Sequence, residues 1–190
     1  MSTTAAAELA MSLNYATLIV LALWRFVPWA RAQPLVNVLW PLLAVHTART
    51  VALQLYSAQA NGLDISDSVR NQIVWGDQVG AVLALLTLVA LWVRPSVVRL
   101  LGWALVTATV IDLGNALVQG IRHDLLADAT DVSWLVLTFY VPTLWVSIAL
   151  VAWLLATRHA ELGTPTPRVL RADASAPEPR VEPRADATPR

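Results

Sequence analysis

Long runs of apolar residues follow one another along the chain as far as residue 157. Five of these runs can cross the hydrocarbon core of a bilayer, which takes about 20 helical residues at about 1.5 Å rise each. They cover about residues 13–30, 34–58, 70–93, 96–119 and 132–157. The pattern therefore predicts an all-α fold, an integral membrane bundle of five transmembrane helices that occupies residues 13–157.

Proline, glycine and short polar residues mark the ends of these runs. Pro34 suits a helix start, and Pro95 disfavours helix at the preceding residue, so the third helix should end near residue 93. Gly120 suits a helix C-cap, and Asp131 or Ser133 suits the N-cap of the fifth helix.

The two ends of the chain differ from the helical part. Residues 1–12 are predicted as a short outer N-terminal segment, and residues 158–190 as a disordered cytoplasmic tail. From Gly163 onward Pro, Ala, Arg, Asp and Glu dominate, and such a segment buries too little apolar surface to offset its ordering entropy. Acids and bases balance there, which argues against a polybasic lipid-binding tail.

Arginines gather on one side of the five-helix arrangement. The first and third connections and the start of the tail carry Arg25, Arg31, Arg94, Arg99 and Arg158. The second and fourth connections hold one arginine each among several aspartates. The positive-inside rule then predicts a multi-pass protein of the cell (inner) membrane with the N-terminus outside and the C-terminus in the cytoplasm.

Tryptophans support the same topology, because most of them fall near predicted helix ends, where aromatic belts form. Those near the ends are Trp24, Trp29, Trp75, Trp92, Trp134 and Trp153. The three that lie deeper, which we expect to pack within the bundle, are Trp40, Trp103 and Trp145.

The first run is the weakest, since Arg25 and Pro28 interrupt it. A cleaved signal peptide is the alternative, because Ala30-Arg31-Ala32 is a loose small-x-small cleavage pattern. A signal peptide needs a positively charged start, however, and no basic residue precedes Arg25. A retained helix is therefore favoured.

Composition narrows the possible functions. Charged residues make up 14% of the chain and hydrophobic ones 57%, where soluble domains have about a quarter charged. Zero net charge argues against a nucleic-acid partner. The absence of cysteine excludes disulfides and cysteine chemistry, and no phosphate loop, zinc motif or nucleophile elbow occurs. No cofactor or metal is predicted, and the lipid bilayer is the expected surrounding.

Ionisable residues inside the predicted helices are the best candidates for function. They are His46, Arg49, Asp77 and Asp112. Each charge costs about 2.5–3.5 kcal/mol at a helix centre, so partners are required. Arg49, Asp77 and Asp112 all fall roughly 10–13 Å from the outer helix ends. We therefore expect Arg49 to lie between the two carboxylates, with the third helix central.

The spacing of neighbouring polar and small residues supports this cluster. His46, Arg49 and Thr50 share one helix face, and Asp112, Asn115 and Gln119 share another. Gly76, Gly80 and Ala84 form a strip that lets helices approach closely. Around Pro142, a kink should free backbone carbonyls near Thr138, Tyr140 and Thr143.

Several of these motifs resemble a family of small bacterial multi-helix membrane proteins of uncharacterised function. The similar segments are 41–49 (PLLAVHTAR), 76–77 (GD), 112–116 (DLGNA) and 140–142 (YVP). The resemblance covers most of residues 34–157 and implies no activity. More distantly, the chain is similar to membrane domains of the sterol-isomerase and sigma-2-receptor type, but it lacks their fuller set of acidic residues.

The leading functional hypothesis is a polar pocket that binds a small amphipathic or lipid-like molecule. His46, Arg49, Asp77, Asp112 and Asn115 would line it, with Arg49 meeting an anionic or carbonyl group. Two alternatives stay open: a membrane enzyme that transfers protons on a lipid, and a non-catalytic subunit whose charges pair with another membrane protein. Ion conduction ranks behind them, because no titratable chain continues to the cytoplasmic side. Equally, buried Arg–Asp pairs can serve only to set helix register.

Overall fold

The computed structural model describes residues 2–129 and 131–163, and these residues fold into helices joined by short connections. The first membrane-length helix comprises α1 (Thr3–Leu21), a π-helical turn (Ala22–Phe26) and α2 (Val27–Ala32). The second comprises α3 (Leu35–Thr47), a 3-10 segment (Ala48–Leu53) and α4 (Gln54–Ala60). No strand occurs within the described residues.

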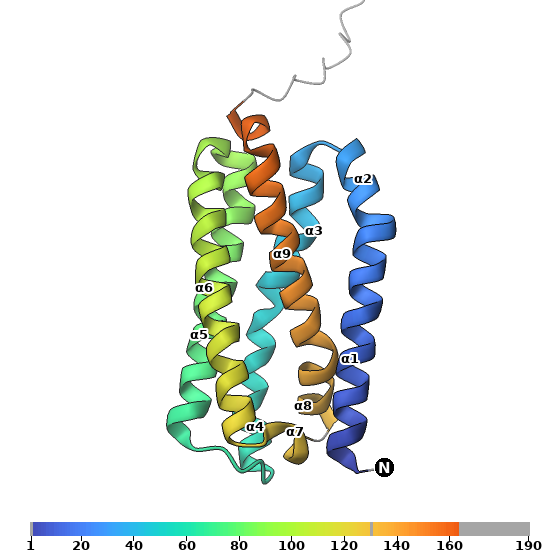
Figure 1. Cartoon of the computed structure of the whole chain (residues 1–190). Coiled ribbons are helices and arrows are strands. Elements are labelled where there is room, and N and C mark those ends of the chain that lie inside the picture. The colour runs from blue at the N-terminus through green and yellow to red at the C-terminus, as the bar shows by residue number, and fades with distance from the viewer. Residues whose placement is uncertain (1, 130, 164–190) are drawn as a thin grey trace, which may run out of the picture.

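The third and fourth helices are continuous, and the fifth is interrupted. The third helix is α5 (Asp67–Val93) and the fourth is α6 (Pro95–Arg122). The short α7 (Leu125–Asp128) follows α6. The fifth joins α8 (Asp131–Leu135), a π-helical turn (Val136–Tyr140) and α9 (Val141–Arg158), and the 3-10 segment His159–Gly163 follows it. Figure 1 shows these helices side by side, with the N-terminus and the end of α9 at opposite ends.

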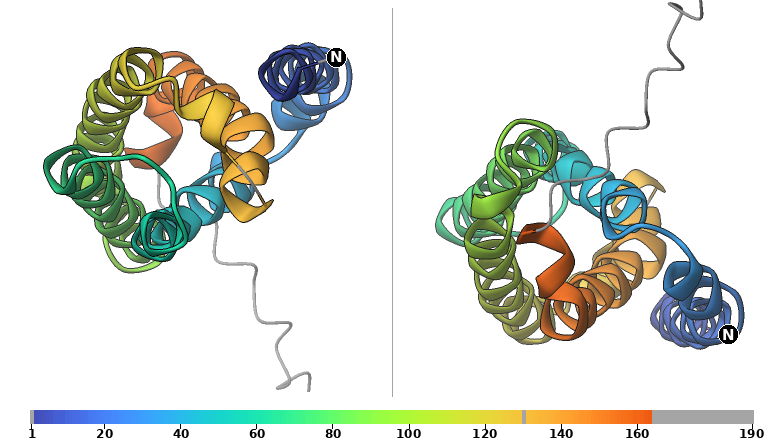
Figure 2. Two further views of the ribbon diagram at one scale, coloured as in Figure 1. Left: turned by 90° about the horizontal axis from the view of Figure 1, so that it is seen from below. Right: turned by 90° about the horizontal axis from the view of Figure 1, so that it is seen from above.

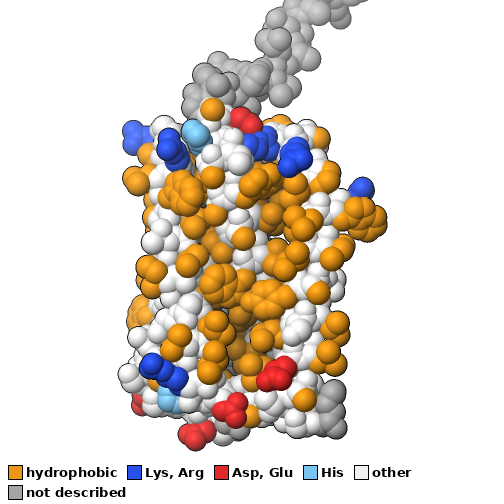
Figure 3. All heavy atoms as spheres, in the orientation of Figure 1, with side chains coloured by type: hydrophobic (Ala, Val, Ile, Leu, Met, Phe, Trp, Pro, Cys, Tyr) orange, Lys and Arg blue, Asp and Glu red, His pale blue; other side chains and the backbone are white. Residues whose placement is uncertain are grey.

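The predicted count of five is confirmed for residues 2–129 and 131–163, where five helices are long and apolar enough to cross a membrane. Their outer surface is broadly apolar between the charged ends, as Figure 3 shows for one face. Leu100 and Ile121, for example, are 73% and 72% exposed. Water-soluble monomers rarely expose contiguous apolar patches beyond a few hundred Å². The surface therefore agrees with a multi-pass membrane protein.

Helix boundaries follow several of the predicted signals. Pro34 immediately precedes α3, and α5 ends at Val93 before Pro95 begins α6. Gly120 does not end its helix, since α6 continues to Arg122. The first helix begins at Thr3, so most of the segment predicted to precede it is helical. Ser2 caps this helix by accepting a hydrogen bond from the Ala5 N–H at 3.2 Å.

The five helices do not contribute equally to the bundle. Figure 2 shows four of them, α3–α4, α5, α6 and α8–α9, around a common interior, while α1–α2 stands outside this ring beside α9. In the most apolar stretch of the first helix only 11% of residues are buried, against 33–44% in the other four. The structure is thus a four-helix core with one peripheral helix.

The two ends of the bundle carry different charges. Arg31, Arg94, Arg99 and Arg158 lie at one end, hereafter the arginine-rich end, and Asp64, Asp67, Asp124 and Asp131 at the other, the acidic end. Figure 3 shows most of the blue side chains toward the top and most of the red ones toward the bottom, although some blue also lies at the bottom and some red at the top. A large apolar core, which includes Leu39, Leu43, Leu105 and Leu154, fills the interior toward the arginine-rich end. A smaller cluster of Ile65, Val69, Ile73 and Leu125 lies at the acidic end.

The peripheral helix is attached through a backbone carbonyl near Pro142. Proline has no N–H, so the Thr138 carbonyl four residues earlier lacks its helical donor. The Asn14 side chain donates its Nδ2–H to this carbonyl at 2.8 Å. The freed carbonyls expected around Pro142 stay a prediction, and α1 supplies a side-chain donor to the Thr138 carbonyl, in the π-helical turn that precedes Pro142.

A second attachment ties the end of α9 to the first connection. The Arg158 guanidinium donates to the carbonyls of Ala30 and Gln33 at 2.6 and 2.8 Å, and pairs with Glu161 at 2.6 Å. Glu161 also hydrogen-bonds the backbone of Leu35 at the start of α3. The first residues of the predicted tail are thus held in place, and residues 164–190 of that prediction lie outside the described residues.

The expectation that the deeper tryptophans pack inside is wrong for two of them. Trp40 is 48% exposed and Trp103 is 39% exposed, while Trp145 is half-buried. A lipid-facing surface accepts an indole ring as readily as an apolar core does, so depth along a helix does not decide which way its tryptophan faces.

Candidate functional site

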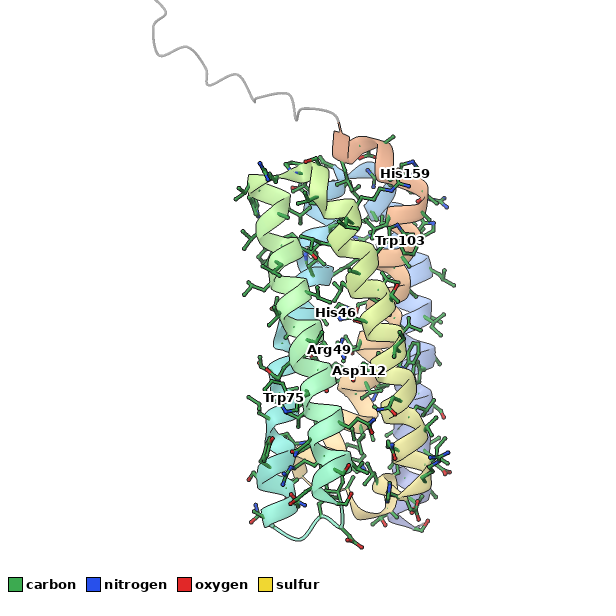
Figure 4. All side chains as sticks on the ribbon, turned by 90° about the vertical axis from the view of Figure 1, so that its left-hand side faces the viewer. His46, Arg49, Trp75, Trp103, Asp112 and His159 are labelled. Carbon is green, nitrogen blue, oxygen red and sulfur yellow. The ribbon has the colours of Figure 1, made fainter. Side chains whose placement is uncertain are left out.

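Arg49 is the centre of a buried polar cluster in the middle of the bundle. It lies in the 3-10 segment that follows α3, and its side chain is fully buried. Its Nε donates to Asp77 Oδ1 on α5 at 2.7 Å, and one terminal nitrogen pairs with the Asp112 carboxylate on α6. Figure 4 shows Arg49 and Asp112 beside each other at mid-height. The predicted pairing of Arg49 with both aspartates is confirmed.

The cluster carries more acid than base. The side chains of Asp77 and Asp112 are only 15% and 10% exposed, so both carboxylates are largely removed from solvent. One guanidinium cannot neutralise two ionised carboxylates, and the low dielectric of the interior strengthens the imbalance. The cluster therefore either shares a proton or attracts a further cationic or hydrogen-donating group.

Thr109 completes the coordination of Arg49 and was not foreseen. The remaining terminal nitrogen of Arg49 donates to Thr109 Oγ1 at 2.8 Å, and Thr109 is fully buried. A signal was present, because Thr109 precedes Asp112 by three residues and so shares its helix face. All three nitrogens of the guanidinium are thus engaged within the chain.

Two glycines of α5 make room for the cluster. A Cβ on Gly80 would lie only 2.6 Å from Arg49 Cζ, and a Cβ on Gly76 only 2.6 Å from Asp112 Cγ. Any larger residue at either position would collide with a charged side chain. The predicted small-residue strip does bring helices close, but here its glycines admit charged groups as well.

His46 belongs to a separate contact one turn away. Its Nε2 lies 2.9 Å from Ser147 Oγ on α9, and Ser147 in turn donates to the Leu144 carbonyl at 3.1 Å. Since the hydroxyl proton is used on Leu144, the Nε2 of His46 is assigned as the donor to Ser147. His46 is fully buried, and its Nδ1 has no hydrogen-bond partner among the described residues.

Asn115 lies one turn beyond Asp112 on α6, where it is half-buried. No hydrogen bond or ion pair joins it to the arginine cluster in the described part of the chain. Gln119, on the same face, donates to Gln72 of α5 at 3.1 Å. Of the five predicted site residues, the structure thus brings Arg49, Asp77 and Asp112 into direct contact and leaves His46 and Asn115 beside them.

A cavity of about 80 Å³ lies between the cluster and the acidic end. Its wall is mostly apolar, with Leu55, Ile73, Leu113 and Leu137 among the lining side chains. Asp77 is the one predicted site residue on this wall, and Tyr140 lies on it as well. The Tyr140 hydroxyl donates to the Val45 carbonyl of α3 at 2.9 Å, which places the ring beside the junction with the 3-10 segment.

A second, more polar hollow of about 350 Å³ opens at the acidic end. Gln54, Leu63 and Ser133 line both this hollow and the cavity beside Asp77, so the two adjoin. Ser57, Asn61 and Asp131 give the hollow its polar wall. Within residues 2–129 and 131–163, no three His, Asp or Glu side chains gather in a way that could hold a metal ion.

One protein family matches this chain. The family model, described as a domain of unknown function (DUF8737), matches residues 6–156, which include all five long helices in whole or in large part and the complete arginine cluster. No curated protein and no solved structure matches the chain. Neither result connects it to domains of the sterol-isomerase and sigma-2-receptor type. The match spans well over half of the sequence, and the chain therefore belongs to the DUF8737 family.

Proposed function

We propose that this protein binds a small amphipathic molecule in the cavity beside Asp77. The bound molecule carries a compact apolar body and a cationic or hydrogen-donating group. One observation carries the proposal. Asp77 belongs to a buried cluster that has two carboxylates for one guanidinium, and it lies on the wall of a mostly apolar cavity. Small-molecule sites typically combine apolar walls with a few well-placed polar groups.

The charge of the cluster sets the kind of head group. Asp77 uses one carboxylate oxygen on Arg49 Nε, and its second oxygen remains for a donor from the ligand. Arg49 does not line the cavity, and its three nitrogens already serve Asp77, Asp112 and Thr109. The ligand therefore meets a carboxylate, and Arg49 positions that carboxylate instead of contacting an anionic group itself.

Access is from the acidic end. The polar hollow adjoins the cavity through the shared residues Gln54, Leu63 and Ser133. With the arginine-rich end in the cytoplasm, as the positive-inside rule favours, the hollow opens on the outer face of the inner membrane. Toward the other end, beyond His46 and Ser147, a large apolar core fills the interior, which supports a dead-end binding site over a conducting path.

A small hydrophobic amine tests the proposal directly. The protein is reconstituted in phosphatidylcholine nanodiscs, and its thermal midpoint is followed with rising n-hexylamine and with hexanoate at equal concentrations. A ligand that binds only the folded state raises its stability by mass action. We expect the amine to raise the midpoint and hexanoate to leave it unchanged.

Two variants on α6 separate cavity binding from partition into lipid. Ala116 lines the cavity, so Ala116→Leu fills it while every member of the arginine cluster is kept. Ala104 is exposed on the outside of the same helix, so Ala104→Leu is the matched control. The amine effect should disappear in the first variant and persist in the second. An amine effect that survives Ala116→Leu, or no difference between amine and acid, would overturn the proposal.

A membrane enzyme that transfers protons on a lipid is the second candidate. It is favoured by the presence of a carboxylate, Asp77, and a phenol, Tyr140, on one cavity wall. Lipid analysis of a deletion strain distinguishes the two: an accumulated precursor supports catalysis, whereas an unchanged lipid profile supports binding.

An assembly subunit whose buried charges pair with another membrane protein ranks third. Arg49, Asp77 and Asp112 already pair with one another inside one chain, so they need no external partner. Co-purification of a second protein that is lost on replacing Asp112 with Asn would reverse this ranking.

A further inference from the structure

An apolar groove runs beside the peripheral helix, away from the cavity described above. It encloses about 550 Å³, which is within the range of small-molecule sites. Its walls are Leu18 and Leu21 from α1, Leu42 and Val45 from α3, and Val146 and Leu150 from α9. It exists because the first helix stands outside the four-helix ring, as Figure 2 shows.

A single charged side chain lies on this groove. Arg25 lines it together with Phe26 and Trp29, whose rings lie 5.4 Å apart between centroids. Arg25 is exposed, and no carboxylate or other partner pairs with it among the described residues. It precedes the end of the first helix at Ala32 by about 10 Å along the axis.

An unpaired arginine at that depth needs an anion. A charge in the hydrocarbon region is costly, and long side chains reach toward the lipid head groups to avoid that cost. The anion available at the boundary of the bilayer is a lipid phosphate, and arginine binds phosphate with two parallel hydrogen bonds. Trp29 provides the amphipathic ring that is typical of this interface.

We infer that the groove is a phospholipid site, with Arg25 on the phosphate and one acyl chain along the α1–α9 wall. Leu18, Leu21 and Ala22 of the first helix line the groove on the side of Arg25 that faces away from the arginine-rich end, so an acyl chain enters from that end and extends toward the middle of the bilayer. A partner helix would instead have to supply an acidic residue opposite Arg25. The phosphate of the surrounding bilayer supplies that charge without a second protein.

This lipid also contacts the interior of the bundle. Ser147 lines the groove and is the hydrogen-bond partner of His46. The bound chain therefore covers the outer side of Ser147, whose hydroxyl is hydrogen-bonded to the His46 ring. This arrangement gives the site a structural role in closing the bundle on the side where α1 is loosely packed.

Native mass spectrometry tests the assignment. The full chain in detergent is mixed with phosphatidylglycerol and phosphatidylcholine. The detergent is then removed in the mass spectrometer, and the phospholipid molecules that stay bound to each protein molecule are counted. We expect one retained phospholipid and roughly fivefold weaker retention in Arg25→Leu, the ratio for one arginine at a lipid surface. Arg25→Lys should restore most of it. Arg99→Leu, which removes an exposed arginine at the same end, should change nothing.

A second variant fills the groove and leaves the charge in place. Val146→Trp should abolish retention while the thermal midpoint stays within a few degrees of the parent protein. Equal retention in Arg25→Leu and Arg99→Leu would overturn the inference. So would retention that is unaffected by Val146→Trp, or a protein that co-purifies with the chain in place of the lipid and is lost in Arg25→Leu.

Discussion

The guanidinium of Arg49 occupies the space that a side chain on Gly80 would need. An added Cβ at Gly80 would lie 2.6 Å from Arg49 Cζ and 3.0 Å from Arg49 Nε. Arg49 is fully buried and held by three partners, so it can withdraw only by breaking hydrogen bonds in the interior. The close packing of α5 against the second helix therefore depends on the position of the Arg49 side chain within the ion cluster.

Gly80→Ala should destabilise the protein by about 1–3 kcal/mol, the cost of overpacking a filled interior. Gly114 on α6 is the matched control, since nothing lies within 4 Å of a Cβ added there. Gly114→Ala should be neutral or slightly stabilising, because alanine favours helix over glycine. Reversible unfolding by dodecyl sulfate in mixed micelles measures both. Equal effects of the two variants would show that Arg49 can move aside.

Arg49→Met should cost about 3–5 kcal/mol, because it leaves two carboxylates buried without a counter-charge. The same replacement combined with Asp77→Asn and Asp112→Asn should recover much of that loss, since the cluster is then neutral. The exposed Arg99→Met is the control. If the triple variant is no more stable than Arg49→Met alone, uncompensated charge is not the cause of the loss.

Asn14→Ala should weaken the attachment of the first helix by about 0.6–1.5 kcal/mol, the usual range for a hydrogen bond between membrane helices. In a Pro142→Ala background the loss should shrink, because alanine supplies the N–H that the Thr138 carbonyl lacks. A double-mutant cycle on unfolding free energies measures this coupling. Additive losses would mean that Asn14 does not act through the carbonyl freed by Pro142.

Arg158→Ala should open the connection between the first two helices. It removes two hydrogen bonds to the Ala30 and Gln33 carbonyls and the ion pair with Glu161. Hydrogen exchange of the backbone amides around Gln33 should accelerate roughly tenfold. Each charge-assisted hydrogen bond contributes about 1.5–3 kcal/mol, and water replaces part of that contribution in the variant. Arg94→Ala, at the same end, should leave that exchange rate unchanged.

Much of the fold could be predicted because a membrane helix has a fixed length per residue. Hydropathy located five helices, and the alternation of arginine and aspartate between connections matched the two ends that the structure displays. The same constant rise allowed the heights of Arg49, Asp77 and Asp112 to be compared along the bundle, and their contact followed. Opposite charges that lie at the same depth in an apolar interior pair with one another, because that pairing lowers the cost of burying each charge.

Rotation of each helix about its axis was harder to predict, because these long helices are apolar on nearly all sides. Trp40 and Trp103 face outward, His46 meets Ser147, and Asn115 stays beside the cluster for this reason. Likewise nothing in the hydropathy of the first run distinguishes a central helix from a peripheral one. Packing within lipid depends on close contact and hydrogen bonds between particular side chains instead of on apolar burial.

The chain by itself therefore determined how many times it can cross a bilayer and at which heights its buried charges lie, because both follow from residue count and helix rise. Only the tertiary structure decided that Asp77, and not Arg49, lies on the cavity wall, and that α1 leaves a groove beside α9. Those features depend on how helices turn and lean against one another. These angles depend on particular contacts, such as the packing of Arg49 against Gly80 and the hydrogen bond from Asn14 to the Thr138 carbonyl.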